Sequence, residues 1–180
     1  MTFKYFSAFS GIGGFDEGIR RVLSDAECIG YSEIDKFAVN IYEQHFPNRT
    51  NYGDIKEINE KEIPDFDLFC GGFPCPSFSI AGKRKGLNDC GRGDLFWEIV
   101  RICRKKQPAY IFLENVEGLL SSQTTKGIYD FDIMMEKLCE IGYVIDFALL
   151  NSKYFGVPQN RSRIFILAKR VDLVLKELII

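Results

Sequence analysis

The chain has 180 residues, of which 46% are hydrophobic, and it carries a formal net charge of −2. This length suits one domain with a sizeable core, and the charge excludes a basic field over the whole chain that would attract nucleic acid. The six cysteines form no CxxC pair and no cluster with the single histidine, which argues against a metal site and for reduced thiols in a cytoplasmic protein. We expect neither a signal peptide nor a membrane span, because no apolar stretch approaches about 20 residues.

Strand-like and helix-like segments alternate along the chain. The patterns predict strands at 4–9, 27–32, 50–52, 66–70, 109–113, 143–150 and 164–168, of which 50–52 is the weakest. They predict helices at 15–23, 36–45, 94–106 and 129–141. Repeated strand–helix units are typical of an α/β domain, here residues 1–180, with a mostly parallel sheet covered by helices on both faces. The carboxyl ends of its strands should share one edge, where ligands bind.

The first of these strand ends is a glycine-rich turn, Ser10–Gly14. Its glycines allow a ligand to approach a helix N-terminus closely, although a simple tight turn explains them equally well. The spacing is GxGG rather than GxGxxG, so a dinucleotide pyrophosphate is not the natural ligand. After the next two strands, Glu33 or Asp35 suits a ribose hydroxyl, and Asp54 suits an adenine amino group. Each acid alone is explained as well by a solvated loop or a helix cap, but three such strand ends in succession favour a ligand.

The fourth strand end carries Cys75, which stands between Pro74 and Pro76. The two prolines stiffen the backbone and suit a nucleophile, although a buried cysteine in a turn is the alternative. Glu114 ends the next strand and should share the same cleft, where it could hold or lend a proton; the alternative is a helix cap. The single histidine, His45, lies in a helical pattern far from Cys75 in sequence, so a Cys–His hydrolase would need an accident of folding.

Arg161 and Arg163 lead into the last predicted strand. At alternate positions of an extended segment, they project to the same side. They could hold a phosphate or a carbonyl oxygen, or they could be charges that protect an exposed strand edge.

Together these motifs resemble those of the bacterial DNA cytosine-5 methyltransferases. The resemblance runs, in the family's order, through 9–15, Glu33, 53–55, 71–79, 92–96, 114–116 and 154–166. It implies a Rossmann-like methyltransferase sheet that ends in an antiparallel hairpin, in a bacterial or phage-encoded protein. It also implies S-adenosyl-methionine as the cofactor and double-stranded DNA as the substrate.

The resemblance further implies a role for individual residues. Cys75 would be the nucleophile, and Glu114 and Arg163, with Arg161 beside them, would hold a cytosine flipped out of the helix. Pro74 would lie near the reacting methyl group. The cofactor-binding set would be Phe9, Gly11, Ile12, Gly13, Gly14, Glu33, Ile34, Asp54, Ile55, Pro74 and Leu95.

The chain departs from the family in its length. Family members usually add a target-recognition domain and then a segment that completes the cofactor domain. We therefore expect the catalytic part of a methyltransferase, incomplete at its C-terminus, which binds a second polypeptide or self-associates. Two alternatives stay open: a non-catalytic remnant that binds cofactor or a partner, and an RNA cytosine-5 methyltransferase.

Overall fold

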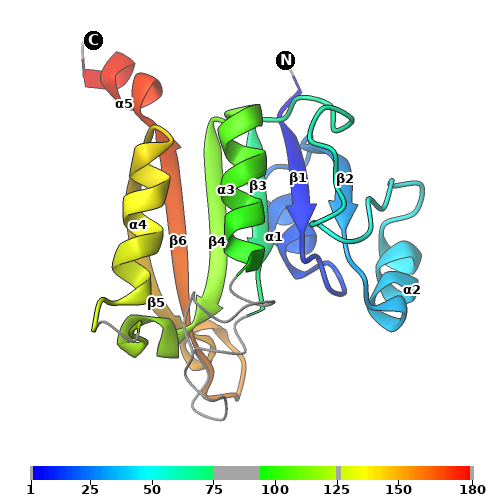
Figure 1. Cartoon of the computed structure of the whole chain (residues 1–180). Coiled ribbons are helices and arrows are strands. Elements are labelled where there is room, and N and C mark those ends of the chain that lie inside the picture. The colour runs from blue at the N-terminus through cyan, green and yellow to red at the C-terminus, as the bar shows by residue number, and fades with distance from the viewer. Residues whose placement is uncertain (1, 75–93, 125–126, 179–180) are drawn as a thin grey trace.

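The computed structural model describes residues 2–74, 94–124 and 127–178, and its strands form one six-stranded sheet (Figure 1). The strands are β1 (Lys4–Ala8), β2 (Glu27–Ser32), β3 (Leu68–Gly72), β4 (Tyr110–Val116), β5 (Tyr143–Asn151) and β6 (Ser162–Arg170). Their order across the sheet is β2-β1-β3-β4-β6-β5. Strands β1 to β4 pair in parallel, whereas β6 is antiparallel to both β4 and β5. The predicted parallel sheet with a closing antiparallel hairpin is confirmed.

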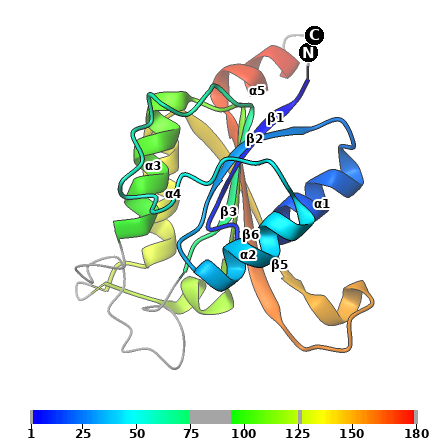
Figure 2. The same ribbon diagram turned by 90° about the vertical axis from the view of Figure 1, so that its right-hand side faces the viewer.

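Helices cover both faces of this sheet. They are α1 (Gly14–Val22), α2 (Lys36–His45), α3 (Asp94–Lys106), α4 (Asp130–Glu140) and α5 (Val171–Leu178), with 3-10 turns η2 (Glu117–Ser121) and η3 (Ser152–Phe155). Figure 2 shows α3 and α4 on one face and α1 on the other, while α2 lies beside the β2 edge (Figure 1). Within the described ranges, no helix has the length and apolar character needed to cross a membrane.

Two elements differ from the sequence prediction. Residues 50–52 form no strand; their backbone makes one isolated parallel bridge, between Asn51 and Tyr31. Helix α5 was not predicted, because its apolar run gives no clear cap or turn signal. In the structure Leu173 and Val174 are partly buried and Asp172 is exposed, which is the two-sided pattern of a surface helix.

The core between the sheet and the α3/α4 layer fixes the strands. Phe6 of β1, Phe69 of β3 and Ile111 of β4 are fully buried against Ile99 of α3 and Met134 of α4. Burying each such side chain contributes roughly 1.5–3 kcal/mol. Because these contacts hold β1, β3 and β4 in register, the residues at their carboxyl ends are held on a rigid edge, the lower edge in Figure 1.

Candidate active site

A cavity of about 350 Å³ lies at the carboxyl ends of β1, β2 and β3. We call it the cofactor cleft; its lining residues are Phe9, Gly11, Ser32, Glu33, Ile34, Asp35, Ala38, Asp54, Ile55, Gly72, Pro74 and Leu95. Of the residues expected to bind cofactor, Ile12, Gly13 and Gly14 are the ones that do not line it. Ser32, Ala38 and Gly72 line it without having been predicted, and Ser32 and Gly72 each lie within two residues of a predicted one.

The carboxylate of Glu33 is held by backbone N–H groups. Its Oε2 accepts a hydrogen bond from Gly11 at 2.8 Å, and its Oε1 accepts from Ile34 and Asp35 at 2.8 Å each. Glu33 therefore ties the end of β2 to the glycine-rich turn. An ionised carboxylate offers about four lone-pair sites, so acceptor capacity remains for ligand hydroxyls.

Asp35 and Asp54 serve their own local backbone. Asp35 caps α2, where its Oδ1 accepts from the N–H groups of Phe37 at 2.8 Å and Ala38 at 3.2 Å. The structure thus favours the helix-cap interpretation of Asp35. Asp54 accepts from the N–H of Lys56 at 3.0 Å, which forms a turn that leaves its carboxylate on the wall of the cleft.

Gly13 is required for packing rather than for the cleft. It is the N-cap of α1 with φ at 93°, and a Cβ there would lie 2.3 Å from a ring carbon of Phe46. Gly14 is the first residue of α1, and a Cβ added to it would meet no atom within 4 Å. The side chain of Ile12 is 60% exposed.

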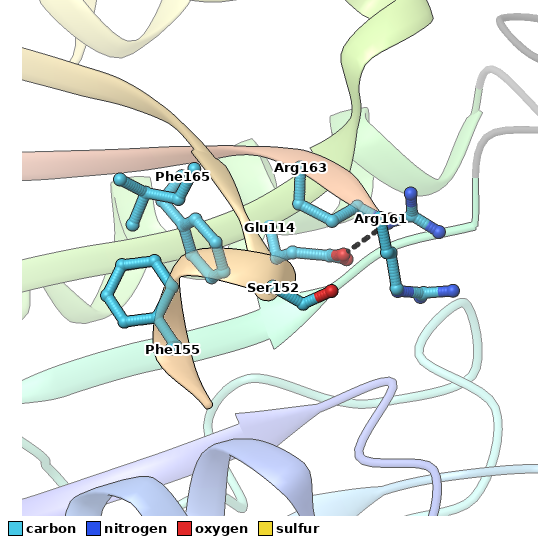
Figure 3. Close-up of a pocket in the computed structure, with 7 residues that line it drawn as sticks. Glu114, Ser152, Phe155, Arg161, Arg163 and Phe165 are labelled. Carbon is cyan, nitrogen blue, oxygen red and sulfur yellow. Dashed lines mark ion pairs between the residues drawn. The ribbon is translucent and has the colours of Figure 1, made fainter. Parts of the chain in front are cut away.

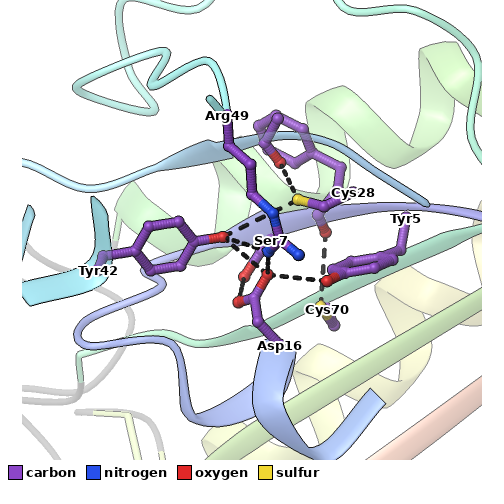
Figure 4. A network of polar contacts seen from close by, with 9 residues as sticks. Tyr5, Ser7, Asp16, Cys28, Tyr42, Arg49 and Cys70 are labelled. Carbon is purple, nitrogen blue, oxygen red and sulfur yellow. Dashed lines mark hydrogen bonds and ion pairs between the residues drawn. The ribbon is translucent and has the colours of Figure 1, made fainter. Parts of the chain in front are cut away.

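A buried polar network fixes α1 directly after the glycine-rich turn (Figure 4). The fully buried Asp16 carboxylate accepts hydrogen bonds from Tyr5 (3.0 Å), Ser7 (2.8 Å) and Tyr42 (2.7 Å), and pairs with Arg49 at 2.6 Å. Burial first, and then the Asp16 charge, raises the pKa of the Tyr5 and Tyr42 hydroxyls, so both remain neutral donors. A buried charge with this many partners is stabilised in place, and it joins β1, α1 and α2 through Tyr5, Ser7, Asp16 and Tyr42.

A second cavity, also about 350 Å³, lies at the ends of β4 and β6 (Figure 3). We call it the catalytic cavity; it is lined by Glu114, Leu150, Ser152, Phe155, Arg161, Arg163 and Phe165. Glu114 and Arg163 form an ion pair of 2.8 Å between Oε1 and Nε, with side chains 23% and 22% exposed. Arg161 lies beside Arg163 in Figure 3, so the structure brings together the three described residues expected to hold the base.

Asn115 was not assigned a site role from the sequence. It is 1% exposed, its Nδ2 donates to the carbonyl of Phe73 at 3.3 Å, and its Oδ1 accepts from Val116 at 2.8 Å. This contact ties the end of β4 to the segment that leads to Pro74. The only indication of this contact in the sequence is that Asn115 is a polar residue directly after Glu114.

The two cavities adjoin at Gly72. Gly72 lines the cofactor cleft, and a Cβ added to it would lie 2.9 Å from Oε2 of Glu114 in the catalytic cavity. Cys75 follows three residues later and lies outside the described residues.

The model of the family described as C-5 cytosine-specific DNA methylase matches residues 3–179. The chain belongs to this family. Among curated relatives, it is 44% identical to the orphan methyltransferase M.Rho11sI of Bacillus phage rho11s, 42% to the type II methyltransferase M.NgoBV of Neisseria gonorrhoeae, and 39% to the type II methyltransferase M.HhaI of Haemophilus parahaemolyticus. The matches cover 95%, 91% and 94% of this chain but 34%, 40% and 50% of the relatives. The chain thus spans half or less of the length of these relatives.

Solved structures agree with this C-5 cytosine methylase fold. Dnmt2 methyltransferase of S. pombe superposes with a TM-score of 0.77 at 22% identity, covering 95% of this chain and 50% of that one. DNMT2 of Spodoptera frugiperda gives a TM-score of 0.76 at 25% identity, covering 96% of this chain and 51% of that one.

The methylase family implies S-adenosyl-methionine as the methyl donor, and the cofactor cleft has groups that fit it. With three of its about four lone-pair sites used, the Glu33 carboxylate keeps acceptor capacity for one more hydrogen bond, and it shares the cavity with Asp54 and with apolar Ile34, Ile55 and Leu95. The Ser10 hydroxyl is buried and has no hydrogen-bond partner among the described residues, so a polar ligand group near the glycine-rich turn would find an available donor.

Proposed function

We propose that this chain is the catalytic part of an enzyme that transfers a methyl group from S-adenosyl-methionine to C5 of cytosine in DNA. The observation that carries the proposal is the junction at Gly72. There, a cleft with the groups for a nucleoside cofactor adjoins a cavity with a paired carboxylate and guanidinium, three residues before Cys75.

The residue types suit the chemistry of cytosine. The Cys75 thiolate adds to C6, and the electron pair of the C5–C6 double bond moves onto C5 while Glu114 supports a proton at N3. Arg163 orients Glu114 through their ion pair, and Arg161, which lines the same cavity, would add a second positive charge beside the base. When bound, S-adenosyl-methionine supplies an electrophilic methyl group for C5. The C5 proton is then lost to water, its electron pair re-forms the C5–C6 double bond, and the bond from Cys75 to C6 breaks with its electrons returning to the sulfur.

In the cofactor cleft, we assign Glu33 to the ribose hydroxyls and Asp54 to the adenine amino group. Phe9, Ile34, Ile55 and Leu95 would pack on the adenosine, with Gly11 beside the methionine end and Pro74 near the methyl group. Gly13 and Gly14 would contribute to cofactor binding indirectly, by shaping the glycine-rich turn. Ile12 would contribute through contact of its exposed side chain with the cofactor.

Double-stranded DNA is the proposed substrate of the active assembly. The net charge of −2 gives this chain no broad electrostatic attraction for a polyanion. We therefore propose that most of the DNA-reading surface is supplied by other residues, from a second polypeptide, a second copy or further sequence.

Two measurements test the proposal. Calorimetry of the purified chain with S-adenosyl-homocysteine should show one saturable site, and absence of binding by a folded chain would contradict the cofactor assignment. Transfer of tritium-labelled methyl groups by the active assembly should occur on duplex DNA and yield 5-methylcytosine. Transfer only to RNA would favour the RNA alternative, and cofactor binding without any transfer would favour a non-catalytic remnant.

A further inference from the structure

Asn51 joins the two segments that carry the acids of the cofactor cleft. It does not line the cleft. Its side chain makes three hydrogen bonds: Nδ2 donates to the carbonyl of Glu33 at 3.1 Å, and Oδ1 accepts from the N–H groups of Glu33 at 3.2 Å and Gly53 at 2.9 Å. The Asn51 amide therefore binds both the N–H and the carbonyl of Glu33, and also the N–H of Gly53, the residue directly before Asp54.

This contact takes the place of backbone pairing. The backbones of 50–52 and β2 pair through Tyr31, whose N–H donates to Thr50 at 2.9 Å and whose carbonyl accepts from Tyr52 at 2.8 Å. At Glu33, two residues further along, the partners are the side-chain atoms of Asn51. After the single bridge at Tyr31, the segment 51–54 can therefore diverge from β2 toward the cleft, while the Asn51 side chain keeps it connected to Glu33.

The hydrogen bonds continue through three residues that line the cleft, Ser32, Glu33 and Gly11. Ser32 donates to the carbonyl of Gly53 at 2.7 Å, and the Glu33 carboxylate accepts from Gly11 at 2.8 Å. A continuous chain of short contacts therefore links Gly53, Asn51, Glu33 and the glycine-rich turn. Gly53 has φ at 70°, a left-handed conformation that a side-chain contact on its N–H helps to hold.

We propose that Asn51 is a positioning residue that sets the spacing between Glu33 and Asp54 and so preorganises the cleft for an adenosine-containing ligand. The inference rests on the proposed function for the identity of that ligand. Neither aspartate nor alanine can make all three hydrogen bonds: aspartate cannot donate to the Glu33 carbonyl, and alanine can neither donate nor accept.

Calorimetry with S-adenosyl-homocysteine on the purified chain tests this role, at a temperature where every variant is fully folded. Asn51→Ala should weaken binding about tenfold, and Asn51→Asp, which keeps the two accepted bonds, should weaken it less. Asn59→Ala is the matched control, since Asn59 is exposed and makes the same kind of local bond, to the Lys61 N–H at 3.2 Å. Ile141→Val, in the core at the C-terminal end of α4, controls for lost stability alone; both controls should bind within twofold of the unsubstituted chain.

Amide hydrogen exchange of the ligand-free chain provides an independent measurement. In Asn51→Ala, the amides of Glu33 and Gly53 should lose protection, whereas those of Tyr31 and Tyr52 should keep theirs. Unchanged protection at Glu33 and Gly53, or undiminished affinity in Asn51→Ala, would overturn the inference. If the unsubstituted chain binds no S-adenosyl-homocysteine, the cofactor assignment fails, and with it the ligand-directed role of Asn51, whatever the exchange result.

Discussion

Glu114 is held between a cation and a glycine. Arg163 pairs with Oε1 at 2.8 Å, and Oε2 lies so close to Gly72 that a Cβ there would meet it at 2.9 Å. The carboxylate therefore has little freedom to move. At the scale of single residues, this fixed orientation is what a group needs if it is to support a proton at one ring nitrogen.

Glu114→Gln should lower methyl transfer by the active assembly by about 10²–10⁴-fold, because the amide keeps the shape but cannot take up the proton. Affinity for S-adenosyl-homocysteine should be unchanged, since Glu114 does not line the cofactor cleft. The matched control is Glu117→Gln, an exposed glutamate three residues later. Transfer by Glu114→Gln within a few-fold of the unsubstituted rate would remove Glu114 from the chemistry.

Glu33 and Asp35 can be separated by a pair of substitutions. Glu33→Ala should weaken S-adenosyl-homocysteine binding by about 1.5–3 kcal/mol, the usual worth of a hydrogen bond to a charged group. Asp35→Ala should instead lower the free energy of unfolding by about 0.5–2 kcal/mol through loss of the α2 cap. Calorimetry and urea unfolding on both variants decide the matter, and a larger loss of affinity in Asp35→Ala would reverse the two assignments.

At the scale of elements, the start of α1 depends on two neighbouring glycines that differ in their surroundings. Gly13→Ala should lower the free energy of unfolding by about 2 kcal/mol or more, because φ is 93° and the new methyl would overlap Phe46. Gly14→Ala should be neutral or stabilising by up to about 1 kcal/mol, since no atom lies near its added Cβ. Urea unfolding measures both; equal effects would mean that the packing of Gly13 on Phe46 does not fix the turn.

Much of the architecture could be predicted because local signals and tertiary structure agree. Residues 36–45 and 94–106 are helices with the predicted bounds, the first opened by the Asp35 cap. Residues 50–52 were mispredicted because the pairing passes from the backbone to the Asn51 side chain, which periodicity cannot reveal. Helix α5 was not predicted because its residues form an apolar run that has no helix-capping residue before it in the sequence.

The candidate site divides in the same way. Motif residues such as Glu33 and Glu114 could be proposed because each follows or ends an apolar strand. Asn51, Asn115 and Phe155 could not, because their roles arise from contacts with segments distant in sequence or, for Phe155, from a 3-10 turn beside the catalytic cavity.

At the scale of the whole molecule, α1 covers one face of the sheet only in part, and the described helices leave open the part of that face that β5 and β6 form. Val144 and Leu150 of β5 and Leu167 of β6 are 48%, 38% and 44% exposed. Register places these side chains on the face opposite α4, since alternate residues such as Phe147 contact Phe131 of α4. Apolar surface of this kind often marks an interface or an aggregation hazard.

The purified chain should therefore self-associate, with a sedimentation mass that rises above the 20.6 kDa of a monomer as concentration increases. Leu167→Lys replaces an exposed apolar side chain of this face by a charged one and should shift the equilibrium toward monomer. Gln44→Lys, at an exposed residue of α2 outside the face, adds the same single positive charge and serves as the control for altered net charge. A chain that stays monomeric at every concentration would contradict the prediction that a second copy of this chain covers the face.

The proposed mechanism depends most on Cys75, three residues after Gly72 in the sequence, forming a covalent bond with cytosine. Long duplex DNA of mixed sequence that the active assembly methylates, prepared with 5-fluorocytosine at every cytosine, tests this most directly, because fluorine cannot leave C5 as a cation and the adduct is trapped. With the active assembly and S-adenosyl-methionine, we predict a complex that survives denaturing electrophoresis, and its loss in Cys75→Ser but not in Cys139→Ser, which changes an exposed cysteine. An adduct that persists in Cys75→Ser, or methylation of ordinary DNA by that variant, would contradict the account.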